Sequence, residues 1–196
     1  MGAMPRKVRS LIAAVAVIIG IAGCAGTGNV DTSVSGSLGF QYGGGGAYIY
    51  TVGHRERAHD VTGTTLQGKR LSLASFRGKY VVVNFWSAAC GPCHGEADAF
   101  EAVSQEYASK GVQFVGIDER DNLDAARSFE RQYHVTYPSL FDRTDAFTLD
   151  FPGATPSTTP FTIILDPQGR IVAKASNAMD LTHLRELVDK VRAQSA

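Results

Sequence analysis

The sequence has no excess of charge of either sign. Its 196 residues include 19 Lys and Arg and 19 Asp and Glu, which gives a formal net charge of zero at pH 7. Long-range attraction to nucleic acid or to anionic lipid is therefore missing, and neither is expected as an electrostatic partner. The chain also lacks the composition of a disordered protein, since 44% of its residues are hydrophobic and 19% are charged. These values indicate one folded domain of ordinary size with additional segments.

Cysteine is scarce, with three residues in the whole chain. Cys90 and Cys93 form the motif Cys90-Gly91-Pro92-Cys93, and Cys24 stands alone near the N-terminus. A purely structural disulfide between Cys90 and Cys93 would close a very short loop and add little stability, because the stabilisation grows with loop length. The pair is therefore interpreted as a redox centre.

The sequence also lacks an apolar run long enough to cross a membrane comfortably, which takes about 20 residues. The run Leu11–Ile21 carries no charge and follows a basic segment at residues 6–9. Basic, apolar and small-residue regions in this order are typical of a signal peptide. Ile21-Ala22-Gly23-Cys24 resembles a bacterial lipobox, which implies cleavage after residue 23 and a lipid on Cys24. The alternatives are an uncleaved anchor or a buried helix. We expect the remaining chain on the extracytoplasmic face of the bacterial cell membrane.

Residues 24–60 are rich in Gly, Ser and Thr and include the run Gly43–Gly46. We expect this segment to be a flexible tether between the membrane and a folded domain. Tyr48–Val52 interrupts it with β-favouring residues, which would dock on the domain as a short edge strand. The compact domain is expected to begin near Val61 and to span residues 61–196, a length that can form a core without disulfides.

Hydrophobic periodicity divides residues 61–196 into alternating strands and helices. The expected strands are Lys79–Trp86, Val112–Ile117, Phe161–Leu165 and Arg170–Ala175, with a hairpin over Thr64–Leu73. The expected helices follow Cys90, Asp121 and Asp180, and the last two of these residues are expected to act as caps. This order predicts an α/β fold with a mixed central sheet, helices on both faces and an N-terminal β-hairpin extension.

The Cys-x-x-Cys motif closely follows the apolar run that ends at Trp86 and precedes the first predicted helix. Unpaired N–H groups and the positive end of the helix dipole at this junction favour the thiolate of Cys90. A thiolate is the attacking species in disulfide exchange, and Cys93 lies one turn further on to resolve the mixed disulfide. Pro92 suits the first helical turn, where its missing N–H costs nothing.

Several motifs occur together and in order over residues 61–194. They are Gly78–Trp86, Cys90–Cys93, Glu96, Tyr137-Pro138 and Pro160–Asp166 with Gly169. In this series the chain resembles the thioredoxin superfamily, and more closely its extracytoplasmic TlpA/ResA branch. The resemblance implies a thioredoxin fold and thiol–disulfide oxidoreductase activity, with no cofactor beyond the Cys90–Cys93 disulfide.

The resemblance also implies roles for individual residues. Cys90 is the implied nucleophile and Cys93 the resolving thiol. Thr159-Pro160 matches a cis-proline whose loop lies against the active cysteines, and an X-Pro bond is the kind that tolerates the cis form. The residues expected to contact substrate are Trp86, Gly91, Pro92, Thr159 and Pro160. Glu96 matches an acid that exchanges a proton with Cys93, and the alternative is a helix-surface carboxylate that favours the first turn through the dipole.

Two positions depart from relatives. Asn84 stands where cytoplasmic thioredoxins carry a buried aspartate, and it cannot titrate. This departure fits the TlpA/ResA branch. Ala89 stands where many relatives have tryptophan, which leaves the surface near Cys90 less aromatic and puts the substrate preference in doubt.

Other interpretations use the same residues. His94 completes the string Cys90-x-x-Cys93-His94, which matches a c-type haem attachment site. The surrounding thioredoxin pattern and the lack of an evident second iron ligand argue against haem, and zinc is disfavoured because no second paired-ligand cluster exists. The acidic stretch Asp118–Asp121 is interpreted as a solvated loop with a helix cap, and a partner surface is the alternative.

These observations predict a membrane-tethered thiol–disulfide oxidoreductase that reduces protein disulfides, with apocytochrome c as the substrate implied by the resemblance. A membrane thiol-reducing protein would supply the electrons, and we expect a monomer. The alternatives are a thiol oxidase or isomerase for secreted proteins, a thiol peroxidase, and a non-catalytic binding module. Peroxidatic cysteines normally occur in a different local pattern, and a binding module would need no reactive thiolate.

Overall fold

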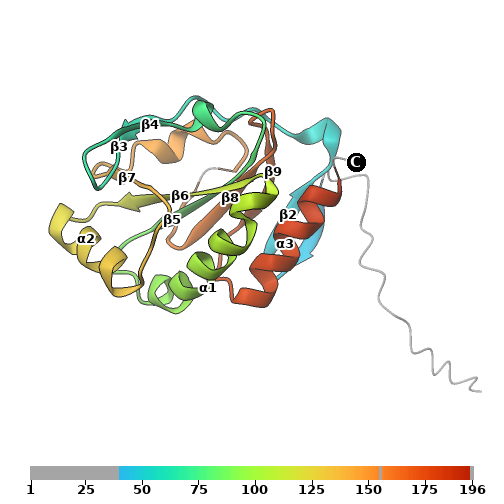
Figure 1. The fold of residues 1–196 in the computed structure, drawn as a ribbon. Helices are drawn as coiled ribbons and strands as arrows, with labels where there is room; N and C mark the ends of the chain where they lie inside the picture. The colour runs from blue at the N-terminus through green and yellow to red at the C-terminus, as the bar shows by residue number, and fades with distance from the viewer. Residues whose placement is uncertain (1–39, 155, 195–196) are drawn as a thin grey trace, which may run out of the picture. The chain divides into compact units, whose positions relative to one another are not determined.

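The structure is a computed structural model that describes residues 40–154 and 156–194. The centre of this part of the chain is a seven-stranded mixed sheet (Figure 1). Its strands are β1 Phe40–Gly44, β2 Ala47–Tyr50, β5 Tyr80–Trp86, β6 Val112–Glu119, β7 Ser139–Asp142, β8 Phe161–Leu165 and β9 Ile171–Ala175, in the spatial order β1-β2-β9-β8-β5-β6-β7. β5, β6 and β7 are parallel, and the other neighbouring pairs are antiparallel. The expected mixed sheet of a thioredoxin fold is confirmed.

β5 is the strand from which the site is built, and it is buried along its whole length. Tyr80 and Val82 pack into the core on one face, whereas Val81, Val83 and Phe85 pack into the core on the other. A strand that is covered on both faces needs apolar side chains at nearly every position. This is why its sequence is a continuous apolar run rather than an alternating one.

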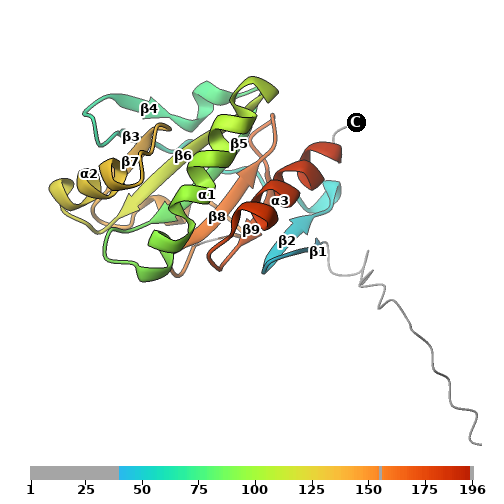
Figure 2. The same cartoon turned by 60° about the horizontal axis from the view of Figure 1, so that its bottom comes forward.

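Helices α1 (Gly91–Tyr107) and α3 (Leu181–Ala193) lie side by side on one face of the sheet (Figure 2). The opposite core receives side chains from β4 (Arg70–Ser72) and from the 3-10 helices η2 (Leu73–Phe76) and η4 (Phe147–Asp150). β4 pairs with β3 (Thr62–Thr64), which corresponds to the hairpin expected over residues 64–73. Helix α2 (Leu123–Gln132) packs in a third cluster with Trp86 and Cys93. None of the helices in the described ranges is long and apolar enough to span a membrane.

The folded domain was expected to begin near Val61, and this boundary is wrong, because residues 40–50 of the expected tether already belong to the domain. β1 and β2 pair with each other, and β2 also pairs with β9, so residues 40–50 extend the sheet. Ala47 and Ile49 are buried, whereas Tyr48 is exposed. The glycines at 44–46 have φ between 56° and 88° and form the turn of this hairpin. The glycine-rich composition therefore serves a tight turn here. The expected signal peptide and Cys24 lie outside the described residues.

Two further local expectations differ from the structure. β6 continues to Glu119, so Asp118 and Glu119 are buried strand residues rather than part of a solvated loop. Asn122, whose side chain accepts a hydrogen bond from the N–H of Ala125, caps α2 in place of Asp121. The cap at Asp180 is confirmed, since its side chain accepts a hydrogen bond from the N–H of His183.

The carboxyl ends of β5 and β6 meet the beginning of β8 at one edge of the sheet. Trp86, the last residue of β5, is in register with Asp118 of β6, and Phe85 is in register with Phe161 of β8. Three separate segments therefore emerge at this edge, at residues 87–90, 120–122 and 159–160. In open α/β sheets such an edge is where sites form, because helix N-termini and loops converge there.

Candidate active site around Cys90 and Cys93

Cys90 lies between the end of β5 and the start of α1, where it is the N-cap of the helix. Its backbone is extended, with φ −84° and ψ 106°, and its Sγ accepts a hydrogen bond from the N–H of Cys93 at 3.2 Å. Pro92 occupies the first turn of the helix. A sulfur held against the N–H groups that begin a helix is well placed to carry negative charge. The geometry therefore favours the thiolate of Cys90.

Cys90 and Cys93 differ in exposure. They are joined in a disulfide, with their Cα atoms 5.3 Å apart. Cys90 is half-buried beside the exposed residues Ala89, Gly91 and Pro92, whereas Cys93 is 1% exposed. An incoming disulfide can therefore reach Cys90 but not Cys93. This difference fits an attacking sulfur and a resolving sulfur.

Thr159 and Pro160 lie at the same edge of the sheet as Cys90. The peptide bond between them is cis. β8 begins at the next residue, Phe161, which pairs with Phe85. Antiparallel register brings residues 159–160 level with the segment that leads from Trp86 to Cys90. Thr159 is half-buried and Pro160 is buried.

Glu96 is buried, so its interpretation as a helix-surface carboxylate is wrong. It lies on α1 one turn after Cys93 and is 2% exposed. One carboxylate oxygen accepts a hydrogen bond from Asn84 Nδ2 at 2.8 Å, and the other accepts one from the N–H of Met179 at 3.1 Å. Burial raises the pKa of Glu96 to about 7, and the two hydrogen bonds oppose the rise. Its carboxyl can therefore gain or lose a proton near neutral pH.

Asn84 now has a clear structural role. It projects from β5 and donates its amide hydrogen to Glu96, so the two positions are directly coupled. An amide can donate to an ionised carboxylate, which a second ionised carboxylate cannot do. The carboxyl that titrates near neutral pH therefore lies on α1, and β5 contributes a neutral partner to it.

Two carboxyl groups of the acidic stretch after Ile117, those of Asp118 and Asp121, lie at the same edge of the sheet in positions that differ from those expected. Asp121 accepts hydrogen bonds from the Ser87 hydroxyl at 3.2 Å and from the N–H of Ala88, so it holds the segment that leads to Cys90. Asp118 is 0% exposed, and neither of its carboxylate oxygens has a hydrogen-bond partner within the described residues. Burial, followed by the neighbouring Asp121 side chain, raises the pKa of Asp118 to about 9. The position of Asp118 beside Trp86 follows from the parallel register of β5 and β6, and that register cannot be read from the sequence.

His94 is held within the protein on both sides of its ring. Its Nδ1 lies 2.8 Å from the Tyr133 hydroxyl, and its Nε2 lies 2.9 Å from the carbonyl oxygen of Ala88. Both ring nitrogens therefore have protein partners, which does not fit the iron ligand of a haem site. No group of three or more His, Cys, Asp or Glu side chains among the described residues is arranged to hold a metal ion.

Trp86, which the resemblance predicts to contact substrate, is buried beneath the surface of the site. It is 3% exposed, and its ring stacks on Phe129 of α2 with centroids 4.3 Å apart and planes 23° apart. Gly116 leaves room for the indole, because a Cβ at that position would lie 2.7 Å from Trp86 Nε1. Trp86 therefore supports the site from beneath.

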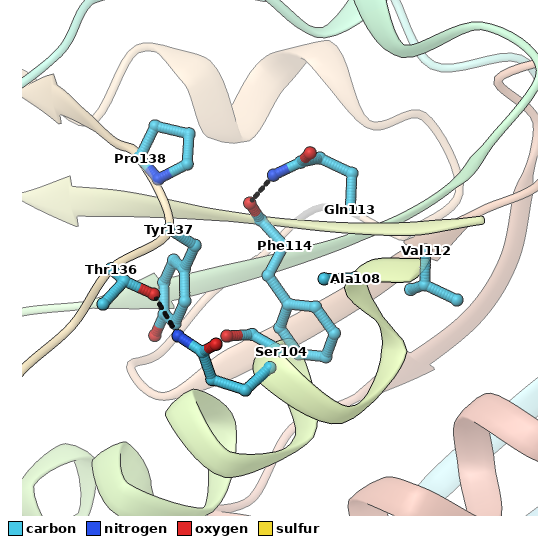
Figure 3. A pocket seen from close by; sticks show the side chains of 9 residues that line it. Ser104, Ala108, Val112, Gln113, Phe114, Thr136, Tyr137 and Pro138 are labelled. Carbon is cyan, nitrogen blue, oxygen red and sulfur yellow. Dashed lines mark hydrogen bonds between the residues drawn. The ribbon is translucent and has the colours of Figure 1, made fainter. Parts of the chain in front are cut away.

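A hollow of about 210 Å³ lies elsewhere on the molecule, against the second half of α1 (Figure 3). Its lining includes Ser104 and Gln105 of α1, Phe114 of β6 and the segment Thr136–Pro138. Because a helix rises about 1.5 Å per residue, Ser104 lies roughly 20 Å along α1 from Gly91. The chemistry is therefore located on a surface around Cys90 rather than in this hollow.

The fold and the cysteine pair define a thioredoxin-fold thiol–disulfide oxidoreductase. The AhpC/TSA family model matches residues 54–174, which is more than half of the chain, so the chain belongs to the AhpC/TSA family.

Individual relatives support the same class. The thiol-disulfide oxidoreductase ResA of Bacillus subtilis (strain 168) is 28% identical over 125 residues, which cover 64% of this chain and 68% of that protein. The thioredoxin-like protein YneN of the same organism is 33% identical over 120 residues, covering 59% and 67%. The expected resemblance to the ResA branch is thereby confirmed.

Two solved structures agree with this assignment. A DsbF homologue from Corynebacterium diphtheriae is similar with a TM-score of 0.69 and 31% identity, covering 79% of this chain and 99% of that one. A secreted thiol-disulfide isomerase from Corynebacterium glutamicum is similar with a TM-score of 0.70 and 26% identity, covering 76% and 92%.

Asp118→Asn is expected to stabilise the protein increasingly as the pH rises. The carboxyl has a pKa of about 9 in the folded chain and an ordinary value of 3.8. The unfolded chain therefore binds fewer protons between these values, and the free energy of unfolding falls as the pH increases. Asparagine stays neutral and removes this cost, a gain on the order of 4 kcal/mol near neutral pH.

Urea unfolding at about pH 4.5 and about pH 8 measures this effect. Asp98→Asn is the matched control, because Asp98 is an exposed carboxylate on α1. We expect that control to change stability little at either pH. A gain from Asp118→Asn that is equal at both pH values would contradict the prediction.

Proposed function

We propose that the chain is a lipid-anchored, extracytoplasmic reductase of protein disulfides. The observation that carries this proposal is the difference between an accessible Cys90 at the start of α1 and a covered Cys93 one turn behind it. Relatives named thiol-disulfide oxidoreductase ResA and a structural neighbour described as secreted support it. The lipobox-like segment that ends at Cys24 supports attachment to the membrane.

The reaction consists of two thiol–disulfide exchanges. The Cys90 thiolate attacks one sulfur of a substrate disulfide, whose other sulfur leaves as a thiolate and takes up a proton. Cys93 then loses its proton and attacks Cys90 Sγ, which releases the second substrate thiolate. The substrate gains two electrons, the protein loses two, and the Cys90–Cys93 disulfide of the structure is the product state. A membrane thiol-reducing protein returns the pair to the dithiol by the same exchange in reverse.

Glu96 is the acid–base group in this proposal. Its carboxylate accepts the proton that Cys93 must lose before the second attack, and it returns a proton when the pair is reduced again. Its burial on α1 one turn after Cys93 and its pKa of about 7 support this role. A carboxyl that titrates near the working pH is best suited to transfer protons in both directions.

Apocytochrome c is the proposed substrate, because the resemblance to the ResA branch implies it. Gly91, Pro92, Thr159 and Pro160 are proposed to meet the substrate strand around Cys90, since they lie on the same edge of the sheet. The exchange needs no metal or organic cofactor. One copy of the chain carries both cysteines, Glu96 and the cis-proline, so we propose that a monomer is active.

An oxidase or isomerase of secreted proteins is the second candidate. It is favoured by the two structural neighbours described as a DsbF homologue and a secreted thiol-disulfide isomerase. The chemistry at Cys90 is the same, but the electrons move in the opposite direction. The reduction potential decides between the two, because thioredoxin has a value of about −270 mV and the strong oxidant DsbA about −120 mV.

Cys93→Ala is expected to trap substrates on Cys90, because the mixed disulfide then lacks its resolving thiol. We expect apocytochrome c among the captured proteins identified by mass spectrometry, and no capture by the control that lacks both cysteines. The wild-type potential, measured against glutathione, is expected near that of thioredoxin. A value near that of DsbA would refute the reductase and favour the oxidase.

Glu96→Gln is expected to remove the step near pH 7 from the rate of disulfide reduction. Glutamine keeps the size of the side chain but cannot exchange a proton, so the resolving attack by Cys93 should slow by roughly tenfold to a hundredfold above neutral pH. Stopped-flow measurement of that step between about pH 5 and about pH 9 tests this. Glu101→Gln, on the same helix, is the control. A profile that keeps its step in Glu96→Gln would remove Glu96 from the proton transfer.

Cys24→Ala is expected to release the protein from the membrane fraction. Labelled palmitate should enter the wild-type protein and not the variant, because the lipid would be attached at this residue. Fractionation of cells that express each protein measures both effects. Unchanged membrane association of the variant would refute the lipid anchor without affecting the redox chemistry.

A further inference from the structure

The peptide group of Ala88, two residues before Cys90, is held on both of its polar sides. Its N–H donates to a carboxylate oxygen of Asp121, and its carbonyl oxygen lies 2.9 Å from His94 Nε2. The preceding residue, Ser87, also donates its hydroxyl hydrogen to Asp121. A short loop segment with this many fixed partners has little freedom to move.

His94 is oriented by α2. Because a carbonyl oxygen only accepts, Nε2 must carry the hydrogen in the bond to Ala88. Nδ1 is 2.8 Å from the hydroxyl of Tyr133, the residue that ends α2. The imidazole also packs against the rings of Phe129 and Tyr133, with centroids 5.0 Å and 5.5 Å away. The ring is thus locked in both position and orientation.

The hydrogen bond between His94 and Ala88 links the residues on either side of the disulfide. His94 directly follows Cys93 in the first turn of α1, whereas Ala88 precedes Cys90. The N–H of Cys90 in turn donates to the carbonyl oxygen of Ser87 at 3.0 Å. The segment that carries Cys90 is therefore tied to the helix that stabilises its sulfur, independently of the disulfide itself.

We propose that His94 is a positioning residue that, with Asp121 and Tyr133, keeps Cys90 at the N-terminus of α1 when the disulfide is open. It acts through the Ala88 carbonyl and does not touch the substrate. The proposal rests on thiol–disulfide exchange at Cys90 and Cys93, and it does not depend on the direction of the electrons or on the lipid anchor.

The consequence for the chemistry follows from the helix cap. In the dithiol form, the Cys90 thiolate is stabilised by the N–H of Cys93 and by the helix dipole only while the two stay aligned. Without the bond from His94, the segment at Ala88 can drift and this stabilisation weakens. The dithiol then becomes less favourable relative to the disulfide, because the stabilised thiolate belongs to the reduced form.

His94→Leu and His94→Gln separate the hydrogen bond from the bulk of the ring. Leucine fills space but cannot donate, whereas the side-chain amide of glutamine can reach the Ala88 carbonyl as Nε2 does. His183→Gln is the matched control, because His183 is an exposed imidazole on α3. Equilibration with glutathione gives the redox equilibrium constant, and iodoacetamide alkylation of the reduced protein near pH 7 gives the reactivity of Cys90.

For His94→Leu we expect the redox equilibrium to shift about tenfold toward the disulfide, which corresponds to about 30 mV, and slower alkylation of Cys90. His94→Gln should stay within about threefold of the wild type, and the control should not change. Tyr133→Phe, which removes only the hydroxyl that orients the ring, should shift the equilibrium in the same direction as leucine but less.

Any of three results would overturn the proposal. If the folded His94→Leu protein has the wild-type equilibrium constant, the bond to Ala88 does not position Cys90. If His94→Gln behaves like His94→Leu, the effect comes from the imidazole itself rather than from the hydrogen bond. Should His94→Leu fail to fold, Tyr133→Phe with an unchanged equilibrium constant would contradict the proposal equally well. Capture of substrates by Cys93→Ala in an otherwise wild-type chain tests the exchange reaction separately.

Discussion

The hydrogen bond from the N–H of Cys93 to the sulfur of Cys90 is the interaction around which this site is organised. It requires α1 to begin at Gly91, directly after Cys90, and it requires β5 to end at Trp86, four residues before Cys90. The buried apolar run of β5 and the cap at Cys90 together fix that junction. Core packing thereby places a reactive sulfur against the positive end of a helix.

The groups around this junction divide into two sets with different tasks. On one side, Asn84, Glu96 and the N–H of Met179 form a buried arrangement whose carboxyl titrates near neutral pH. On the other side, Asp121 and His94 hold the segment before Cys90. In the proposed mechanism the first set handles protons and the second holds Cys90 in position, so the proton supply of Cys93 and the reactivity of Cys90 should be separately alterable.

Much of the fold was predictable because its signals are local. The strand β8, the start of α1 after Cys90 and the cap at Asp180 match their expected positions, since apolar runs and capping residues act over a few residues. The cysteine pair is equally local. Asp118 and Asp121 were not predictable in their observed roles, because these depend on how β6 is aligned beside β5. The stacking of Trp86 on Phe129 was not predictable either, because Phe129 belongs to a helix that is distant in the sequence.

The sequence by itself determined which residues can do chemistry here: a cysteine pair at a strand-to-helix junction, an acid one turn later and an X-Pro bond before an apolar strand. Tertiary structure alone decided their states. It buried Glu96 against Asn84 and raised its pKa, brought Thr159 and Pro160 to the edge that carries Cys90, and turned His94 toward Ala88. It also joined residues 40–50 to the sheet. The physical reason is that propensity and capping act along the chain, whereas desolvation and hydrogen-bond partners depend on segments that meet only when the sheet forms.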